Sequence, residues 1–308
     1  MAAYLSEMAS SVNPPQSNLG KSAINVLARL VPRRFRRDIP VVPVVRIAGV
    51  IGVVSPLRPG LLLSTIARSL ERAFGTPRAR AVALVINSPG GSPSQSHLIF
   101  RRIRQLAEEK KLPVLAFVED VGASGGYMLA CAADEIICND FSIVGSIGVV
   151  GASFGFHELM EKVGIERRLY TSGDRKAMLD PFLPEKPDDV KRIKAIQQDI
   201  HEHFIALVKE RRGSRLNGSD KMLFSGEFWA AQKAIELGLA DRVGDLRSTL
   251  RERYGEKVHM PLISAERSLF GRRLPGINLA NAFGNQPGLA DDFISALEIR
   301  ALWGRYGL

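Results

Sequence analysis

Apolar and polar residues follow two different periods in the body of the chain, residues 38–263. Short apolar runs rich in β-branched residues predict buried strands, and longer stretches with apolar positions three or four residues apart predict helices. Strands and helices alternate and are joined by short turns that contain glycine, which is typical of parallel βαβ units in an α/β domain. The predicted strands cover residues 41–54 (one strand or two), 81–87, 113–118, 135–138 and 167–170, and the predicted helices cover residues 61–74, 94–110, 123–133, 188–212 and 228–237.

The two ends of the chain differ from this body. Residues 1–19, with Pro, Ser and Asn, are predicted to be disordered. Residues 21–35 have apolar positions at helical spacing between basic ones, which fits a helix on an anionic membrane or a helix packed on the domain or a neighbouring subunit. An organelle transit peptide is a third alternative for this end. Residues 291–303 predict an amphipathic helix after a linker rich in Gly, Pro and Asn. We therefore expect a basic tail (1–37), a central domain (38–263) and a linker with a C-terminal helix (264–308).

Composition limits the kind of protein. A chain of 308 residues, 45% of them hydrophobic, can bury the core of one large α/β domain with extensions, and two small domains are the alternative. Its two cysteines, Cys131 and Cys138, cannot build a disulfide framework, which favours a reducing compartment. The seven-residue spacing between them is no metal motif, so we expect buried, inert thiols.

The formal net charge is +10, and six basic residues occur in positions 21–37 without an acidic one. This excess attracts anionic surfaces, and because no nucleic-acid-binding module accompanies it, we do not expect a nucleic-acid partner. The sequence contains no run of about 18 apolar residues and no signal-peptide pattern. We therefore expect a cytoplasmic protein without a transmembrane segment, with peripheral contact to the inner face of an anionic membrane as an option.

Ser124 is the first residue that points to chemistry. It follows a predicted strand and opens a predicted helix, between Gly122 and the pair Gly125 and Gly126. A serine nucleophile needs its hydroxyl on a sharp turn with small neighbours, and it gains from the free amides of a helix N-terminus. The alternative is an N-cap serine whose glycine neighbours allow tight packing. This stretch alone does not decide between the two.

The turn at residues 87–91, Asn-Ser-Pro-Gly-Gly, follows another buried strand. The amides of Gly90 and Gly91 could approach a ligand closely and donate to the oxyanion of a tetrahedral intermediate. The phosphate-binding pattern of nucleotide-binding loops is missing here, so a nucleotide is not indicated. An ordinary turn is the alternative.

A serine nucleophile also needs a base. The five histidines are His97, His157, His201, His203 and His259, and none has an obvious orienting carboxylate in the sequence. This shortage directs attention to Lys176, which follows the predicted strand 167–170. A lysine works as a base only where burial disfavours its charged form. Taken by itself, a lysine is more often a solvated surface charge.

Six ordered blocks of sequence resemble peptidase family S49, the signal peptide peptidase A and SohB-type proteases. The resemblance runs from about residue 44 to 243, and its specificity lies in the order of the blocks. The blocks are Arg46-Ile-Ala-Gly-Val-Ile, Ile86-Asn-Ser-Pro-Gly-Gly, Ala123-Ser-Gly-Gly-Tyr, Val144-Gly-Ser-Ile-Gly-Val-Val, Gly173-Asp-Arg-Lys and Phe224-Ser-Gly followed by Ala234-Ile-Glu-Leu-Gly-Leu-Ala-Asp.

The resemblance implies a ClpP/crotonase fold, a spiral of ββα units, and a serine peptidase that forms homo-oligomeric rings and uses neither metal nor nucleotide. It implies that Ser124 is the nucleophile, that Lys176 is the general base and that Ser146 orients the lysine. The oxyanion hole would consist of Gly90 or Gly91 with Gly125. The implied substrates are remnant signal peptides and other apolar peptides or proteins. The N-terminal membrane anchor common in the family is not visible in this sequence, which leaves membrane location and signal-peptide substrates open.

Three other functions remain open at this point. A crotonase-type acyl-CoA enzyme would use paired glycine amides to hold a thioester enolate and would need neither Ser124 nor Lys176. A ClpP-like Ser-His-Asp peptidase would need a suitably placed histidine, and none follows Ser146 before His157. An inactive scaffold would organise membrane partners through the basic tail and the C-terminal helix.

Overall fold

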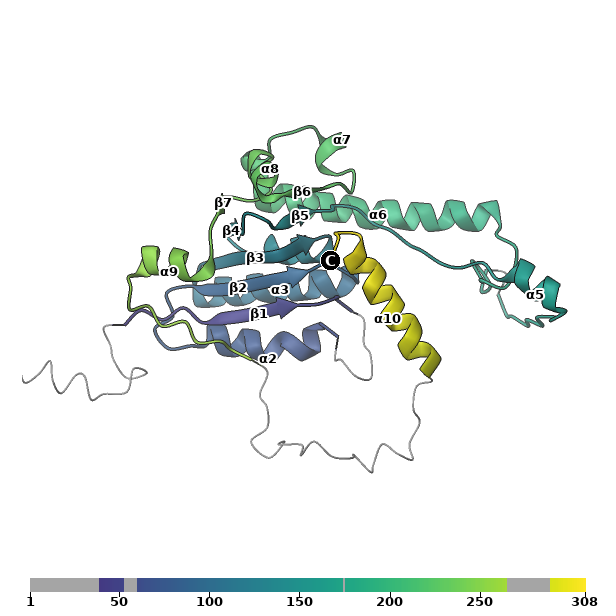
Figure 1. Ribbon diagram of the computed structural model, residues 1–308, viewed down its shortest axis with the longest axis horizontal. Coiled ribbons are helices and arrows are strands. Elements are labelled where there is room, and N and C mark those ends of the chain that lie inside the picture. The colour runs from purple at the N-terminus through teal and green to yellow at the C-terminus, as the bar shows by residue number, and fades with distance from the viewer. Residues whose placement is uncertain (1–38, 53–59, 174, 265–288) are drawn as a thin grey trace, which may run out of the picture.

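The computed structural model describes residues 39–52, 60–173, 175–264 and 289–308. In these ranges the chain forms one seven-stranded sheet flanked by helices (Figure 1). The strands are β1 (Val44–Ala48), β2 (Val82–Ser88), β3 (Val114–Ala123), β4 (Glu135–Cys138), β5 (Ile143–Gly145), β6 (Phe228–Ala230) and β7 (Arg242–Val243). The helices are α2 (Leu63–Phe74), α3 (Pro93–Lys110), α4 (Gly125–Ala130), α5 (His157–Val163), α6 (Pro187–Arg212), α7 (Asp220–Leu223), α8 (Ala231–Glu236), α9 (Leu246–Tyr254) and α10 (Leu289–Gly304), with a 3₁₀ turn at Gly213–Arg215.

The sheet is mostly parallel. Its order is β1-β2-β3-β4-β7, and β5 pairs with the end of β3 and with β6. Only the β5–β6 pair is antiparallel among these strands. The predicted α/β fold class is thus confirmed, with a mostly parallel sheet. Because β1, β2 and β3 are parallel, the turns that follow them gather at one edge of the sheet.

Apolar side chains fill both faces of the sheet. One cluster joins alternate residues of β1–β4 to α2, α3, α4 and α6, and it includes Leu84, Ile86, Ile103 and Leu129. The other cluster lies on the opposite face, where Leu250 of α9 packs near Phe117 and Ile137. Strands buried on both faces explain the nearly continuous apolar runs that predicted them.

Most predicted elements are present, and three are corrected. The segment 167–170 is not a strand; its residues are exposed and pair with no strand among the described residues. The predicted helix 228–237 begins as β6, because Trp229 is buried where this stretch pairs with β5, and turns helical only at Ala231. The predicted strand 113–118 continues to Ala123, so β3 leads directly to Ser124.

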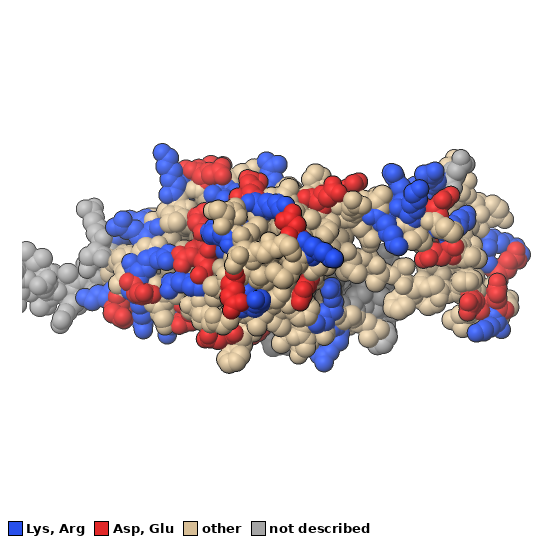
Figure 2. Space-filling model, turned by 90° about the horizontal axis from the view of Figure 1, so that it is seen from above, with Lys and Arg blue, Asp and Glu red and all other residues tan. Residues whose placement is uncertain are grey.

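A protruding arm, residues 149–186, leaves the body between β5 and α6. None of its described residues is buried, and α5 has no buried side chain. In Figure 1, α6 extends past the sheet and α5 lies at its far end. Figure 2 shows a separate lobe at that end of the long axis, and basic and acidic side chains interspersed over the visible face.

The predicted tail 1–37 and the linker up to residue 288 lie outside the described residues, apart from position 264. The predicted C-terminal helix 291–303 corresponds to α10. Among the helices in the described ranges, none has both the length and the apolar character that crossing a membrane requires.

Candidate active site

Ser124 occupies the turn between β3 and α4. Its backbone has φ 51° and ψ −122°, a conformation that residues with a side chain rarely adopt, and such strain persists only where the surroundings impose it. Its amide donates a hydrogen bond to the carbonyl oxygen of Gly145 (2.8 Å). The residue is half-buried, and its hydroxyl has no hydrogen-bond partner among the described residues. A strained turn that presents a serine in this way is typical of enzymes with a serine nucleophile.

The glycine loop after β2 packs directly against this turn. A Cβ atom added at Gly90 would lie 2.8 Å from the Cβ of Ser124, and one added at Gly126 would lie 2.4 Å from the carbonyl oxygen of Ser88. Gly90 also has φ 104°, which favours glycine. The two glycine motifs that the sequence singled out therefore form one site, and their glycines are required by the close approach.

The structure separates the three glycines predicted for an oxyanion hole. The amide of Gly90 donates to the hydroxyl oxygen of Ser88 (3.2 Å). The amide of Gly91 has no partner among the described residues, and Gly125 lies in the first turn of α4, where the helix leaves amides unpaired. Gly91 and Gly125 line the same small pocket as Ser124, and Gly90 does not. Free amides beside a serine hydroxyl can stabilise a developing oxyanion.

That pocket is narrow and apolar. Its volume is about 20 Å³, which is room for little more than one water molecule. Apart from the glycines and Ser124, its walls are apolar side chains from α3, α4, α6 and the segment after β5. These are Pro93, Met128, Val149, Ile200 and Phe204.

Ser146 lies beside Ser124 in the sheet. Gly145 pairs with Ala123 in the parallel β3–β5 ladder, so the two serines are the next residues on neighbouring strands. Ser146 is buried with φ 53°, and its amide donates to the carbonyl oxygen of Glu227 (2.7 Å). Its hydroxyl has no hydrogen-bond partner in the described part of the chain. The hydroxyl is therefore free to accept a hydrogen bond from a further group.

Lys176 is not brought to these serines within one chain. It lies on the arm, its side chain is exposed, and its amide donates to the carbonyl oxygen of Gly173 (3.2 Å). No hydrogen bond joins it to Ser124 or Ser146 among the described residues, and it is absent from the walls of the pocket. The predicted pair of Ser124 and Lys176 is therefore not assembled in the single chain.

The sequence did not predict that α6 forms part of the pocket beside Ser124. Ile200 and Phe204, four residues apart on this mostly polar helix, line the pocket, and that spacing was the available signal. Nε2 of His201 lies 3.0 Å from the carbonyl oxygen of Ile147, so this nitrogen must carry the proton and donate it. His97 is exposed and stacks on Phe100. Neither histidine is placed as a base for Ser124.

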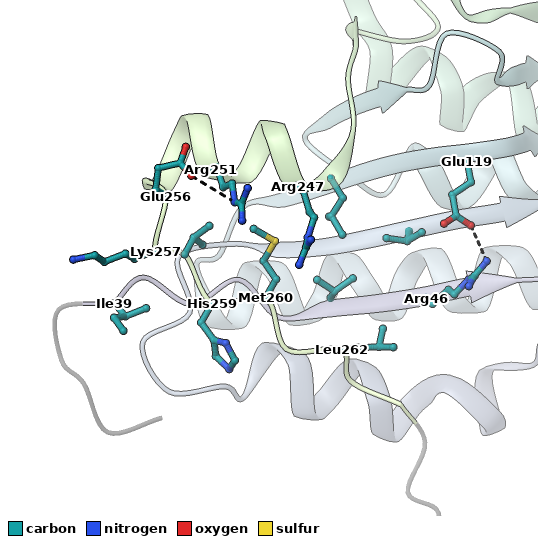
Figure 3. A pocket seen from close by; sticks show the side chains of 14 residues that line it. Ile39, Arg46, Glu119, Arg247, Arg251, Glu256, Lys257, His259, Met260 and Leu262 are labelled. Atoms are coloured by element: carbon teal, nitrogen blue, oxygen red, sulfur yellow. Dashed lines mark hydrogen bonds and ion pairs between the residues drawn. The ribbon is translucent and has the colours of Figure 1, made fainter. Parts of the chain in front are cut away.

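Larger hollows occur away from these residues. A pocket of about 670 Å³ lies between β1, α9 and residues 256–262, and Figure 3 shows its lining side chains. Two ion pairs occur within it, Arg46 with Glu119 and Arg251 with Glu256. A second hollow of about 730 Å³ adjoins it and shares Arg46 and Glu119. None of the predicted site residues lines either hollow.

Comparisons with known proteins find similarity to peptidases. The sequence model of peptidase family S49 matches residues 106–257, which include Ser124, Ser146 and Lys176. A chloroplastic serine protease, SPPA, from Arabidopsis thaliana is 32% identical over 206 residues, covering 66% of this chain and 29% of that protein. A solved structure of a membrane-bound stomatin-specific protease aligns with a TM-score of 0.42 and 16% identity, covering 74% of this chain and 95% of that one. Residues 106–257, about half of the chain, therefore match peptidase family S49.

A longer relative carries a different name. A protein of Brucella abortus named Na(+)/H(+) antiporter NhaA is 52% identical over 300 residues, which cover 95% of this chain and 40% of that protein. The chain thus spans well under half the length of this relative. Because nearly all of this chain is aligned, the relative shares the region matched by the S49 model.

Proposed function

We propose that this protein is a serine peptidase in which Ser124 is the nucleophile and Lys176 the general base. The observation that carries the proposal is the strained, half-buried Ser124 beside the unpaired amides of Gly91 and Gly125. The match of residues 106–257 to the sequence model of family S49 supports it.

The reaction would proceed by acyl transfer. The neutral amine of Lys176 takes the hydroxyl proton of Ser124, and Oγ attacks the scissile carbonyl carbon. The amides of Gly91 and Gly125 stabilise the oxyanion. Collapse breaks the C–N bond, and the lysine gives its proton to the leaving amine. A water molecule, deprotonated by the same lysine, then hydrolyses the ester. In this account the hydroxyl of Ser146 accepts a hydrogen bond from Lys176 and orients it.

The base would come from a neighbouring copy of the chain. On the arm the side chain of Lys176 is exposed to water, whereas burial at a subunit interface disfavours the charged form of a lysine. The arm also exposes large apolar side chains, which a monomer in water rarely gathers in one segment. They are Val150, Phe154, Phe156, Leu159, Val163, Ile165, Leu169, Tyr170 and Phe182. A ring of subunits, each with its arm over the next, would bury them.

The small pocket suggests the substrate. A pocket that touches both the nucleophile and the oxyanion donors would receive the side chain before the scissile bond. Its apolar walls and small volume favour alanine there over a larger side chain. Apolar peptides with small residues, signal-peptide remnants among them, fit this description. Contact of residues 20–37 with an anionic membrane stays a prediction, because these residues lie outside the described ranges.

The test is hydrolysis of short apolar peptides by mixed oligomers. Ser124→Ala and Lys176→Ala should each lose several orders of magnitude in kcat/KM when expressed alone. Co-expression of the two variants should restore part of the activity, because the Ser124 of one subunit meets the Lys176 of the next. The matched control is co-expression of Ser124→Ala with the double variant, which should stay inactive.

Each outcome of this test bears on a different part of the proposal. Unaltered activity of Ser124→Ala alone would contradict the nucleophile. Unaltered activity of Lys176→Ala would contradict the base. Inactive single variants without recovery on co-expression would show that both groups act within one chain, and the arrangement between subunits would be wrong.

A further inference from the structure

The C-terminal segment lies against the candidate active site. Tyr306 is 7% exposed, although it follows the end of α10. It forms a small apolar cluster with Val121 and Ala123 at the end of β3, and Trp303 packs against this cluster. Ala123 immediately precedes Ser124, so the cluster supports the strained turn from the side of the strand.

The same tyrosine also contacts the other two segments of the site. Its hydroxyl donates to the carbonyl oxygen of Pro89 (3.5 Å), the residue before Gly90. Its ring meets the ring of Phe228 edge-on, with centroids 5.0 Å apart. Phe228 pairs with Gly145, which precedes Ser146 and accepts the hydrogen bond from the Ser124 amide.

Tyr306 therefore contacts a residue next to each of the three loops that form the site. These contacts are Pro89 before Gly90, Ala123 before Ser124, and Phe228, which pairs with the residue before Ser146. Burial of the Tyr306 ring stabilises this contact more than its hydrogen bond to Pro89 does. A hydrogen bond of 3.5 Å is weak, whereas a buried aromatic ring removes a large apolar surface from water. The contact joins residues far apart in sequence, and residues 303–308 lie outside the region 106–257 that the family model matches. The loops of the candidate site are therefore packed against a C-terminal segment that lies outside the region matched by the family model.

We propose that Tyr306 is a positioning residue for catalysis, and that the C-terminal segment fixes the relative placement of Ser124 and the oxyanion amides. This inference rests on the proposed peptidase function. Tyr306 touches no reacting atom in this account and acts through Pro89, Ala123 and Phe228. Loss of its ring would let the loops after β2 and β3 shift, and small displacements of a nucleophile lower kcat steeply.

The test compares Tyr306→Ala with Tyr306→Phe in the full chain, on the same apolar peptide. We expect Tyr306→Ala to lower kcat by about 10- to 100-fold while KM changes less than about threefold. Tyr306→Phe keeps the ring and should stay within about threefold of the unaltered protein. Leu297→Ala removes an exposed side chain of α10 and serves as the matched control, with no change expected.

Amide hydrogen exchange gives a second measurement that does not depend on activity. Tyr306→Ala should speed exchange in peptides that cover residues 87–92 and 120–126, with exchange unchanged in β4 and α9. If both kcat and this local exchange stay as in the unaltered protein, the inference is wrong. If the unaltered protein cleaves nothing but exchange responds as expected, the structural support stands and the proposed function fails instead.

Discussion

Substitution of Asp241 by Asn should destabilise the protein strongly, because it leaves a buried guanidinium without its counter-ion. The side chain of Arg212 is 2% exposed and that of Asp241 is 19% exposed. Two parallel hydrogen bonds of 2.9 Å join them, and Arg212 Nε also donates to the carbonyl oxygen of Gly238 (2.7 Å). Asp241 further accepts from the amide of Ile136 (2.7 Å). Asn keeps the shape of the side chain, removes the charge and turns one of the two acceptor oxygens into an NH2 donor.

The cost follows from the burial of the pair. Breaking a buried ion pair on one side typically costs about 3–5 kcal/mol. At about 2–4 °C per kcal/mol for a domain of this size, the melting temperature should fall by roughly 6–20 °C. The assay is thermal unfolding by circular dichroism, or denaturant unfolding if heating is irreversible.

The matched control is the exposed pair of Lys233 and Glu236 on α8. Lys233→Met should change the free energy of unfolding by less than about 0.5 kcal/mol, since exposed pairs contribute little. A melting temperature of Asp241→Asn within about 2 °C of the unaltered protein would refute the reasoning. That result would mean that the guanidinium is hydrated or that Asn satisfies it.

The pH dependence has a definite sign. Burial by itself would raise the pKa of Asp241, but the hydrogen bond from Arg212, the amide of Ile136 and the nearby arginine charges outweigh it, and the pKa lies below its ordinary value. A carboxylate with a lowered pKa stabilises the fold above its unfolded pKa of about 3.9, and this contribution is lost as the pH falls through the folded value. The stability difference between the unaltered protein and Asp241→Asn should therefore shrink below about pH 4.

Three further predictions concern the site and the core. Gly126→Ala would place a Cβ 2.4 Å from the carbonyl oxygen of Ser88. It should lower the free energy of unfolding by about 1–3 kcal/mol and slow the labelling of Ser124 by a fluorophosphonate, and unchanged stability and labelling would contradict the close approach. Ile200→Ala should widen the small pocket and raise kcat/KM for peptides with leucine before the scissile bond relative to alanine, whereas Ile193→Ala, on the same helix but outside the pocket lining, should not alter that ratio. Burial raises the pKa of Cys131 to about 11 and that of Cys138 to about 12, so Ellman's reagent at pH 8 should titrate neither thiol in the folded protein and both after denaturation; rapid reaction of the folded protein would show that the thiols are accessible.

The sequence predicted the parts of the fold that depend on local pattern. The apolar runs of β2 and β4 and the periodic stretches of α2 and α3 match the structure closely, because burial on the sheet dictates their residue types. The end of β3 was missed because Glu119 and Asp120 interrupt the apolar run. The strand continues there because the next residues pair with β5.

The proximity of two predicted segments of the candidate site could be foreseen from the sequence, whereas other parts of its arrangement could not. Ser124 and the two glycine loops are short-range motifs, and their proximity follows from parallel strands that end at one edge. The choice between Gly90 and Gly91 depends on the hydroxyl of Ser88, which takes the Gly90 amide, and no local pattern encodes that. Lys176 lies on the exposed arm, and no pattern near it in the sequence fixes its position relative to Ser124. The packing of Tyr306 depends on contacts between residues far apart in sequence, so the pattern of residues 291–303 predicted a helix but not its contacts.

The most direct test of the central claim is fluorophosphonate labelling of the purified protein, mapped by mass spectrometry. The account predicts a single labelled residue, Ser124, with labelling abolished in Ser124→Ala and retained in Ser225→Ala, which removes an exposed serine. Labelling at a different serine, or undiminished labelling of Ser124→Ala, would contradict the assignment of the nucleophile. Absence of labelling together with no cleavage of apolar peptides would contradict the peptidase function itself.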